Sequence, residues 1–554
     1  MESDLEVARR ARLRPILDVA AELGLGPADV RPHGHDKAKI ELSAAADAPL
    51  DGRLILVSAM SPTPAGEGKT TVTVGLGQAL GKLGARALVA IREPSLGPVL
   101  GLKGGAAGGG HAQVVPMESI NLHFTGDLHA ITCAHNVLAA LVDNALHFRE
   151  GPALDPRRVT WKRVLDVNDR ALRQVTVGLG GTAQGVPRET GFDITAASEV
   201  MAVFCLARDR ADLRARLARI VVGETYDREP VTAGDLGADG PMAALLDEAL
   251  APNLVQTLEG TPALVHGGPF ANIAHGTNSI IATRMGLRLA DYVVTEAGFG
   301  FDLGAEKYFD IVCRAGGFAP AAVVIVATVR ALKLHGGARL ADLKTPDLAA
   351  LRRGLCNLDA HLATARAFGV PAVVAINKFA TDDPAELAAV RGHCAAMDQP
   401  AEEVDVFARG GEGGLALARQ VKALADGHTT GYTPLYELAL PPEEKIRAIA
   451  RQAYGAADVH FTPEASRKLA RAVAQGFGGL PICMAKTEKS LSDDPKVLGR
   501  PTDFTLTVRD VVISAGAGFL VALTGDLLRM PGLPRHPAGL SLGVDADGRI
   551  TGLA

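Results

Sequence analysis

The stretch that decides the fold covers residues 54–70 and reads LILVSAMSPTPAGEGKT. Its first residues form a short apolar run that predicts a strand, and the residues after the turn, to about residue 83, have the spacing of a helix. The turn is rich in glycine and ends in Gly68-Lys69-Thr70, which matches the end of the phosphate-loop pattern G-x-x-x-x-G-K-[ST]. Thr63 stands where that pattern usually begins with glycine. The order of strand, loop and helix predicts a nucleotide phosphate site.

Each part of this loop has an expected role in holding ATP, although a plain glycine turn is the alternative. Gly66 and Gly68 let the backbone turn its N–H groups toward phosphate, and the helix N-terminus adds positive partial charge. Lys69 would reach the β- and γ-phosphates, and the Thr70 hydroxyl would take a position on the Mg²⁺ that accompanies ATP. The residues expected to bind ATP are Thr63, Pro64, Ala65, Gly66, Glu67, Gly68, Lys69, Thr70 and Thr71.

Apolar runs that alternate with helical stretches recur along the chain beyond the loop. The run 87–91 follows the first helix and completes a β-α-β unit, and such an all-apolar strand is typical of a parallel sheet covered on both faces. The alternation predicts a doubly wound, mostly parallel α/β sheet like that of P-loop NTPases, with smaller additional α/β domains. We expect domains over 1–350, 351–442 and 443–554. Further strand candidates are 263–265, 292–294, 322–327 and 370–376.

The strand 87–91 runs directly into Arg92 and Glu93. Ligands of open α/β sheets bind beyond the carboxyl ends of the strands, so Arg92 is expected to face the phosphate loop. A guanidinium there can hold a transferring phosphoryl group in a bidentate clamp, whereas a surface pair with Glu93 is the alternative. Asp127 is a candidate carboxylate partner or general base, or a helix cap.

A second glycine-rich stretch covers residues 104–110 and reads GGAAGGG. It cannot form a stable helix or strand interior. Because it lacks bulky side chains, its backbone can approach a ligand or another chain closely, and a flexible surface loop is the alternative.

Composition excludes several classes of function. The net charge is −5 with both signs interspersed, and no basic run could follow a nucleic acid backbone. No stretch of about 20 apolar residues predicts a membrane span, and the N-terminus lacks the apolar core of a signal peptide. The six cysteines are scattered without a C-x-x-C pair, which favours reduced thiols in a cytoplasm over disulfides or zinc. They are Cys133, Cys205, Cys313, Cys356, Cys394 and Cys483.

Taken together, the motifs resemble those of formate–tetrahydrofolate ligases. The resemblance runs over essentially the whole chain in order, and its most specific parts are the glycine-rich stretch and the segment 326–337. The motifs concerned are the phosphate loop 63–70, REPSLGP at 92–98, GLKGGAAGGG at 101–110, the segment 117–135, TEAGFG at 295–300, VATVRALKLHGG at 326–337 and MPGLP at 530–534.

The resemblance implies that ATP, formate and tetrahydrofolate are converted to 10-formyltetrahydrofolate, ADP and phosphate through formyl phosphate. It implies that Lys69 and Arg92 are catalytic, and that Arg92, Glu93 and Asp127 form the formate and formyl phosphate site. Lys69, Arg92 and Mg²⁺ would neutralise the anionic substrates, and Arg92 would stabilise the oxyanion of the second step. Activation by a monovalent cation, K⁺ or NH4⁺, and a homotetramer are implied as well.

Four residues correspond to the folate side of that family's site. Phe299 matches an aromatic residue that lines the cavity, and its flanking glycines favour a loop with an exposed ring. Phe379, in the 351–442 region, matches one that packs on the pterin. Where the family has Pro and Trp, this chain has Ala380 and Phe407. Phe407 retains a stacking face but lacks the indole area and N–H, so folate affinity is affected more than chemistry.

Two other classes of protein are alternatives. One is a P-loop ligase that activates a different carboxylate as an acyl phosphate, like dethiobiotin synthetase. The other is a nucleotide-dependent switch, but Asn377-Lys378 lacks the Asp that would read guanine. Arg330 and Lys333, three residues apart on an expected helix, form either a solvated basic face or an anion site.

Overall fold

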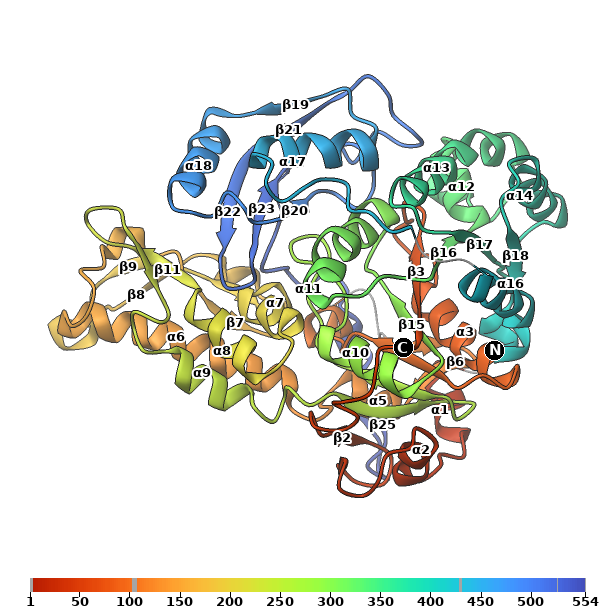
Figure 1. Cartoon of the computed structure of the whole chain (residues 1–554), viewed down its shortest axis with the longest axis horizontal. Coiled ribbons are helices and arrows are strands. Elements are labelled where there is room, and N and C mark those ends of the chain that lie inside the picture. The colour runs from red at the N-terminus through yellow and green to blue at the C-terminus, as the bar shows by residue number, and fades with distance from the viewer. Residues whose placement is uncertain (1–2, 102–106, 428–430, 526, 554) are drawn as a thin grey trace.

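The computed structural model describes residues 3–101, 107–427, 431–525 and 527–553. Its centre is a large, mostly parallel sheet in a mixed α/β architecture (Figure 1). The strands predicted at 54–57, 87–91, 263–265, 292–294, 322–327 and 370–376 are confirmed within a residue or two at most ends. The parallel strands, in spatial order, are β14 (Pro262–Val265), β4 (Ala87–Ile91), β15 (Tyr292–Glu296), β3 (Arg53–Ala59), β16 (Ala322–Ala327), β17 (Ala372–Asn377) and β18 (Ala401–Val404).

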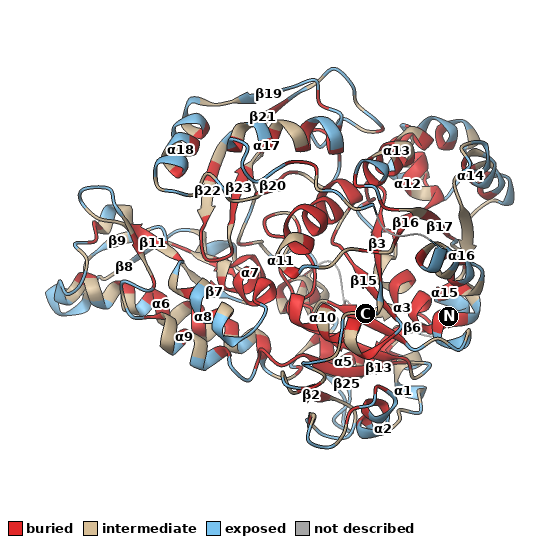
Figure 2. Ribbon diagram, in the orientation of Figure 1, coloured by how far each residue is buried: buried red, intermediate tan, exposed pale blue. Residues whose placement is uncertain are grey.

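The central parallel strands are mostly apolar because both faces of the sheet are covered (Figure 2). Leu54 and Leu56 of β3 belong to one hydrophobic core, whereas Ile55 and Val57 belong to another. The first core contains α10 (Ile280–Leu289), α12 (Val329–His335) and α13 (Leu348–Ala367). The second contains α3 (Lys69–Lys82) and α16 (Leu415–Gly427).

Antiparallel strands extend the sheet beyond β14. They are β13 (Asn253–Thr257), β2 (Ala38–Ile40), β1 (Val30–Pro32), β6 (Ala112–Val115) and β5 (Gly108–Gly109). Between β6 and β13 the chain forms a helical segment that includes α6 (Asp127–Phe148), β7 (Arg163–Leu165), β10 (Phe192–Ile194), α7 (Glu199–Leu206), α8 (Arg210–Ala218) and α9 (Asp239–Leu246). This segment lies to one side of the sheet in Figure 1.

The C-terminal part of the chain forms its own small sheets. Its elements are α17 (Pro442–Ile449), β19 (Asp458–Phe461), α18 (Pro463–Ala474), β20 (Ile482–Ala485), β21 (Thr505–Val508), β22 (Asp510–Ser514) and β23 (Phe519–Leu523). The segment 351–442 contributes β17 and β18 to the same sheet as β3, and α13 spans position 350. The division into three domains stays a prediction.

Candidate active site

The carboxyl ends of the parallel strands meet at one edge of the sheet, and the predicted site residues lie along it. The phosphate loop follows β3, Arg92 follows β4, and Glu296 is the last residue of β15. These three strands are neighbours, with β15 hydrogen-bonded to both β3 and β4. Phe379 follows β17, one strand beyond β16 on the other side of the loop. Open α/β sheets bind their ligands at such an edge.

Glu67 fixes the conformation of the phosphate loop from within. Its buried carboxylate accepts a hydrogen bond from the N–H of Thr63 at 2.6 Å and another from the hydroxyl of Thr328. Its backbone carbonyl accepts from Asn377 Nδ2 at 3.0 Å. Gly68, the N-cap of α3, has a φ of 70°, which favours glycine. The loop is therefore held by its own carboxylate and by the ends of β16 and β17, while its tip, residues 64–66, is exposed.

Glu296 joins the phosphate loop to Arg92. It accepts a hydrogen bond from the Thr70 hydroxyl at 2.8 Å, and its other oxygen is 3.6 Å from Arg92 Nη2. Arg92 also donates to the carbonyl of Pro269 at 3.3 Å. The hydroxyl of Thr70 and the carboxylate of Glu296 are hard oxygen donors of the kind that Mg²⁺ prefers. The sequence contained a signal for Glu296, because an apolar strand ended in Thr-Glu, but no role was predicted for it.

Glu93 points into the protein, unlike Arg92. It is buried, so the alternative of a surface pair between Arg92 and Glu93 is wrong. Burial raises the pKa of Glu93 well above its ordinary value, and the nearby charge of Asp127 raises it further. Asp127, the first residue of α6, is buried and lies 2.8 Å from Lys39 Nζ. Lys39, which sequence reasoning missed, is thus the charge partner of Asp127.

Phe299 occupies the turn after β15. Its φ of 57° is unusual for a bulky side chain, which makes it a strained position of the kind found at functional sites. The adjoining Gly298 is close enough to Arg92 that a Cβ there would lie 3.2 Å from Nη1. Phe299 is partly exposed. The turn that carries Phe299 therefore lies against Arg92, which Glu296 connects to the phosphate loop.

The other predicted folate residues lie toward the opposite edge strand. The guanidinium of Arg330 stacks on Phe379 with 3.5 Å between its Cζ and the ring centroid, and Ala380 is exposed. Phe407 follows β18 and is 44% exposed, and its carbonyl accepts from His111 N–H at 2.8 Å. A Cβ on Gly109 would lie 3.1 Å from the Phe407 ring. Phe407 thus adjoins the second glycine-rich stretch, whose residues 104–106 lie outside the described residues.

The two basic residues of α12 have different environments. Lys333 is buried and lies 3.2 Å from Glu386, so a solvated basic face is wrong for this residue. Arg330 is engaged with Phe379.

Within residues 3–101, 107–427, 431–525 and 527–553, no helix is long and apolar enough to cross a membrane. Within the same ranges, no group of three or more His, Cys, Asp or Glu side chains is arranged to hold a metal ion.

Known proteins resemble the whole chain. Residues 2–554 match the family described as formate–tetrahydrofolate ligase. A formate–tetrahydrofolate ligase of Paracoccus denitrificans is 59% identical, with 100% of both chains covered. One of Bacillus licheniformis is 58% identical, with 100% of this chain and 99% of the relative covered.

Proposed function

Because the chain belongs to the formate–tetrahydrofolate ligase family, we propose that ATP, formate and tetrahydrofolate meet at the carboxyl edge of its central sheet. The chain is a ligase that joins formate to tetrahydrofolate and gives 10-formyltetrahydrofolate. Full-length relatives with this activity leave no reason to prefer another carboxylate, as in dethiobiotin synthetase, or a nucleotide switch. The observation that carries the placement is the Thr70–Glu296–Arg92 connection between two neighbouring strand ends.

The ATP phosphates bind residues 63–71, in a sheet of the P-loop NTPase type. Support comes from the left-handed backbone of Gly66 and Gly68 and from α3, whose N-terminus begins at Lys69. Lys69 contacts the β- and γ-phosphates. Thr70 and Glu296 would hold the Mg²⁺ that accompanies ATP, and this ion would neutralise charge at the phosphates.

Two successive transfers then make the product. A formate oxygen attacks the γ-phosphorus and the bond to ADP breaks, which gives formyl phosphate. The folate N10 attacks the formyl carbon, the bond to phosphate breaks, and N10 loses its proton. Arg92 neutralises the transferring phosphoryl group and then the oxyanion of the second step. It can do so because its guanidinium is partly exposed at the carboxyl edge of the sheet, where Glu296 holds it.

Glu93 and Asp127 belong to the formate side. Glu93 follows Arg92 directly, and its Oε2 has no hydrogen-bond partner in the described part of the chain. The charge of Asp127 raises the pKa of Glu93 and that of Lys39, its ion-pair partner, lowers it.

The folate binds between Phe299 on one side and Phe379, Ala380 and Phe407 on the other. Support comes from the exposed ring of Phe407 and from the partly exposed ring of Phe379, which Arg330 braces. Aromatic faces of this kind stack on a flat heterocycle.

We further propose a homotetramer, activation by K⁺ or NH4⁺, and a cytoplasmic location with six free cysteines.

One assay tests the proposal. The protein is mixed with Mg-ATP, formate and tetrahydrofolate, and ADP and formylated folate are measured in wild type, Lys69→Ala and Arg92→Ala. Turnover that requires all three substrates and falls by about 10³-fold in both variants is expected. Arg86→Ala is the matched control, because Arg86 lies at the opposite end of the same strand and pairs with Asp291 at the surface. ADP release indifferent to formate and folate would overturn the proposal.

A further inference from the structure

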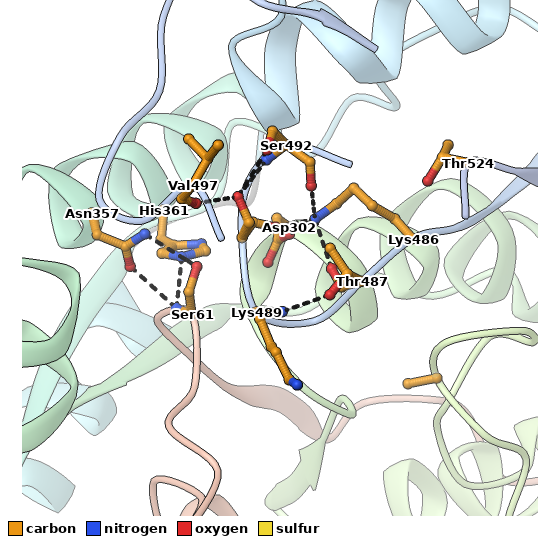
Figure 3. A network of polar contacts seen from close by, with 12 residues as sticks. Ser61, Asp302, Asn357, His361, Lys486, Thr487, Lys489, Ser492, Val497 and Thr524 are labelled. Atoms are coloured by element: carbon orange, nitrogen blue, oxygen red, sulfur yellow. Dashed lines mark hydrogen bonds and ion pairs between the residues drawn. The ribbon is translucent and has the colours of Figure 1, made fainter. Parts of the chain in front are cut away.

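Ser61 begins the segment that leads into the phosphate loop, and side chains of α12 and α13 bind all of its polar groups. Figure 3 shows the two from α13, Asn357 and His361. The Ser61 backbone N–H donates to His361 Nε2 at 2.9 Å and to Asn357 Oδ1 at 3.2 Å. Its carbonyl oxygen lies 3.0 Å from His335 Nε2. Its hydroxyl is 3.1 Å from both Asn357 Nδ2 and His361 Nε2. These contacts define one orientation of the Ser61 backbone.

Both histidines are neutral, and their partners define which ring nitrogen carries hydrogen. Burial lowers the pKa of each to about 4. His335 accepts the N–H of Gly499 at Nδ1, so its Nε2 carries the hydrogen that Ser61 O accepts. His361 accepts at Nε2, so its hydrogen lies on Nδ1, for which the described residues offer no partner. Each ring thus presents the group that the Ser61 backbone requires.

The same side chains bind a loop of the C-terminal part, residues 486–499. Asn357 Nδ2 donates to the carbonyl of Gly499 at 2.8 Å, which adds to the bond between Gly499 N–H and the ring on α12. At the start of this loop, Lys486 lies 3.1 Å from Asp302, and both side chains are fully buried (Figure 3). Asp302 comes just after the turn that contains Phe299. The loop 486–499 therefore contacts the side chains that hold Ser61, before the phosphate loop, and also Asp302, after the turn that contains Phe299.

We propose that His335, Asn357 and His361 are positioning residues for the phosphate loop, and that the C-terminal loop 486–499 holds them in place. The inference rests on the proposed ATP site. Ser61 and the N–H groups of residues 66–70 belong to one short segment, so a rotation of the Ser61 peptide redirects the donors that receive phosphate. The network does not contact the nucleoside, so its loss should weaken binding of a nucleotide more, the more phosphates that nucleotide carries.

The test measures dissociation constants of AMP, Mg-ADP and Mg-ATP by calorimetry. In His361→Phe the acceptor for the Ser61 N–H is lost while ring volume is kept, and we expect about tenfold weaker ATP binding, a smaller loss for ADP and none for AMP. His361→Gln, whose amide oxygen can accept that N–H, should restore most of the ATP affinity. His135→Phe is the matched control, because His135 of α6 is also buried but stacks on Trp161 and has no contact with Ser61 in the described part of the chain.

Gly499→Ala supplies a second measurement if His361→Phe folds poorly. Gly499 has a φ of 75°, and a Cβ there would lie 3.1 Å from His335 O, so the loop would shift. The same dependence on phosphate number is expected. If wild type does not bind ATP more tightly than AMP, or Lys69→Ala does not weaken ATP, the proposed ATP site fails. If those hold but both variants bind ATP as wild type does, or lose all three nucleotides equally, the positioning role is wrong.

Discussion

Glu296 joins two strand ends of the proposed nucleotide site. It is buried, accepts from the Thr70 hydroxyl and lies near Arg92, so we expect its charge to act on both the proposed Mg²⁺ position and the guanidinium. In Glu296→Gln the shape is kept and the charge is lost. We expect kcat to fall on the order of 10²-fold and the Mg²⁺ requirement to rise. The measurement is a Mg²⁺ titration of turnover at saturating ATP. Glu248→Gln, at an exposed glutamate, is the control, and a Mg²⁺ dependence equal to wild type contradicts the role.

Phe407 provides a test of the folate side at the same scale. Its ring is 44% exposed beside the glycine-rich stretch, where a flat heterocycle can stack on it. Phe407→Ala should raise the KM for tetrahydrofolate about 3- to 10-fold with kcat nearly kept, because aromatic stacking contributes about 0.5–1.5 kcal/mol. Phe407→Trp should lower that KM. Steady-state kinetics with folate varied give both values. Phe148→Ala, another exposed phenylalanine, is the control, and an unchanged KM in Phe407→Ala would show that the folate binds elsewhere.

At the scale of the element, local patterns were sufficient to predict the sheet. Strands 87–91 and 322–327 are confirmed residue for residue, because a strand buried on both faces must be apolar at every position. The contacts that complete the site were beyond such patterns. Thr70 and Glu296 are 226 positions apart, and Ser61 and His361 are 300 apart. In the sequence Lys39 looks like an ordinary charged residue, and only the structure places Asp127 against it. Only the packing of the whole chain reveals these pairs.

The junction between the phosphate loop and α3 depends on one glycine. Gly68 has a φ of 70°, and a Cβ there would lie 2.6 Å from Asn377 Nδ2, which itself holds the carbonyl of Glu67. Gly68→Ala therefore introduces backbone strain and displaces a support of the loop. We expect at least about tenfold weaker ATP binding, since such strain costs about 1–3 kcal/mol. Gly84→Ala is the control. Gly84, just after α3, also has a positive φ, but an added Cβ there would meet open space. Equal ATP affinity in the two variants would contradict the argument.

At the scale of the whole molecule, the C-terminal part connects two regions that are remote in sequence. Its loop 486–499 binds the network beneath the phosphate loop, and its turn at Gly516 packs on the helical segment. Glu199 of α7 accepts hydrogen bonds from two N–H groups of that turn, Gly516 at 2.8 Å and Ala517 at 3.3 Å. Arg216 of α8 donates to the carbonyl of Ala517 at 2.9 Å. Polar contacts thus fix the C-terminal part both to the side chains that hold Ser61 and to the helical segment.

The Glu199 contact makes the stability of this assembly depend on pH. Burial raises the pKa of Glu199 to about 7, and the N–H groups of the turn lower it only in part. The folded state therefore binds more protons than the unfolded state between the ordinary carboxyl pKa of about 4.3 and pH 7, so the contribution of Glu199 to stability falls as pH rises through that window.

Replacing Glu199 by glutamine isolates this effect. Glutamine keeps an oxygen for both N–H groups and does not titrate, so Glu199→Gln should unfold close to wild type at pH 5 and be more stable at pH 8, by on the order of 1 kcal/mol. Thermal unfolding of both proteins at intervals from pH 5 to pH 8 measures the difference. Glu189→Gln, at an exposed position, should follow wild type throughout. A difference between Glu199→Gln and wild type that stays constant or shrinks as pH rises would mean that Glu199 is ionised without cost, and that the docking of the C-terminal turn is independent of its protonation.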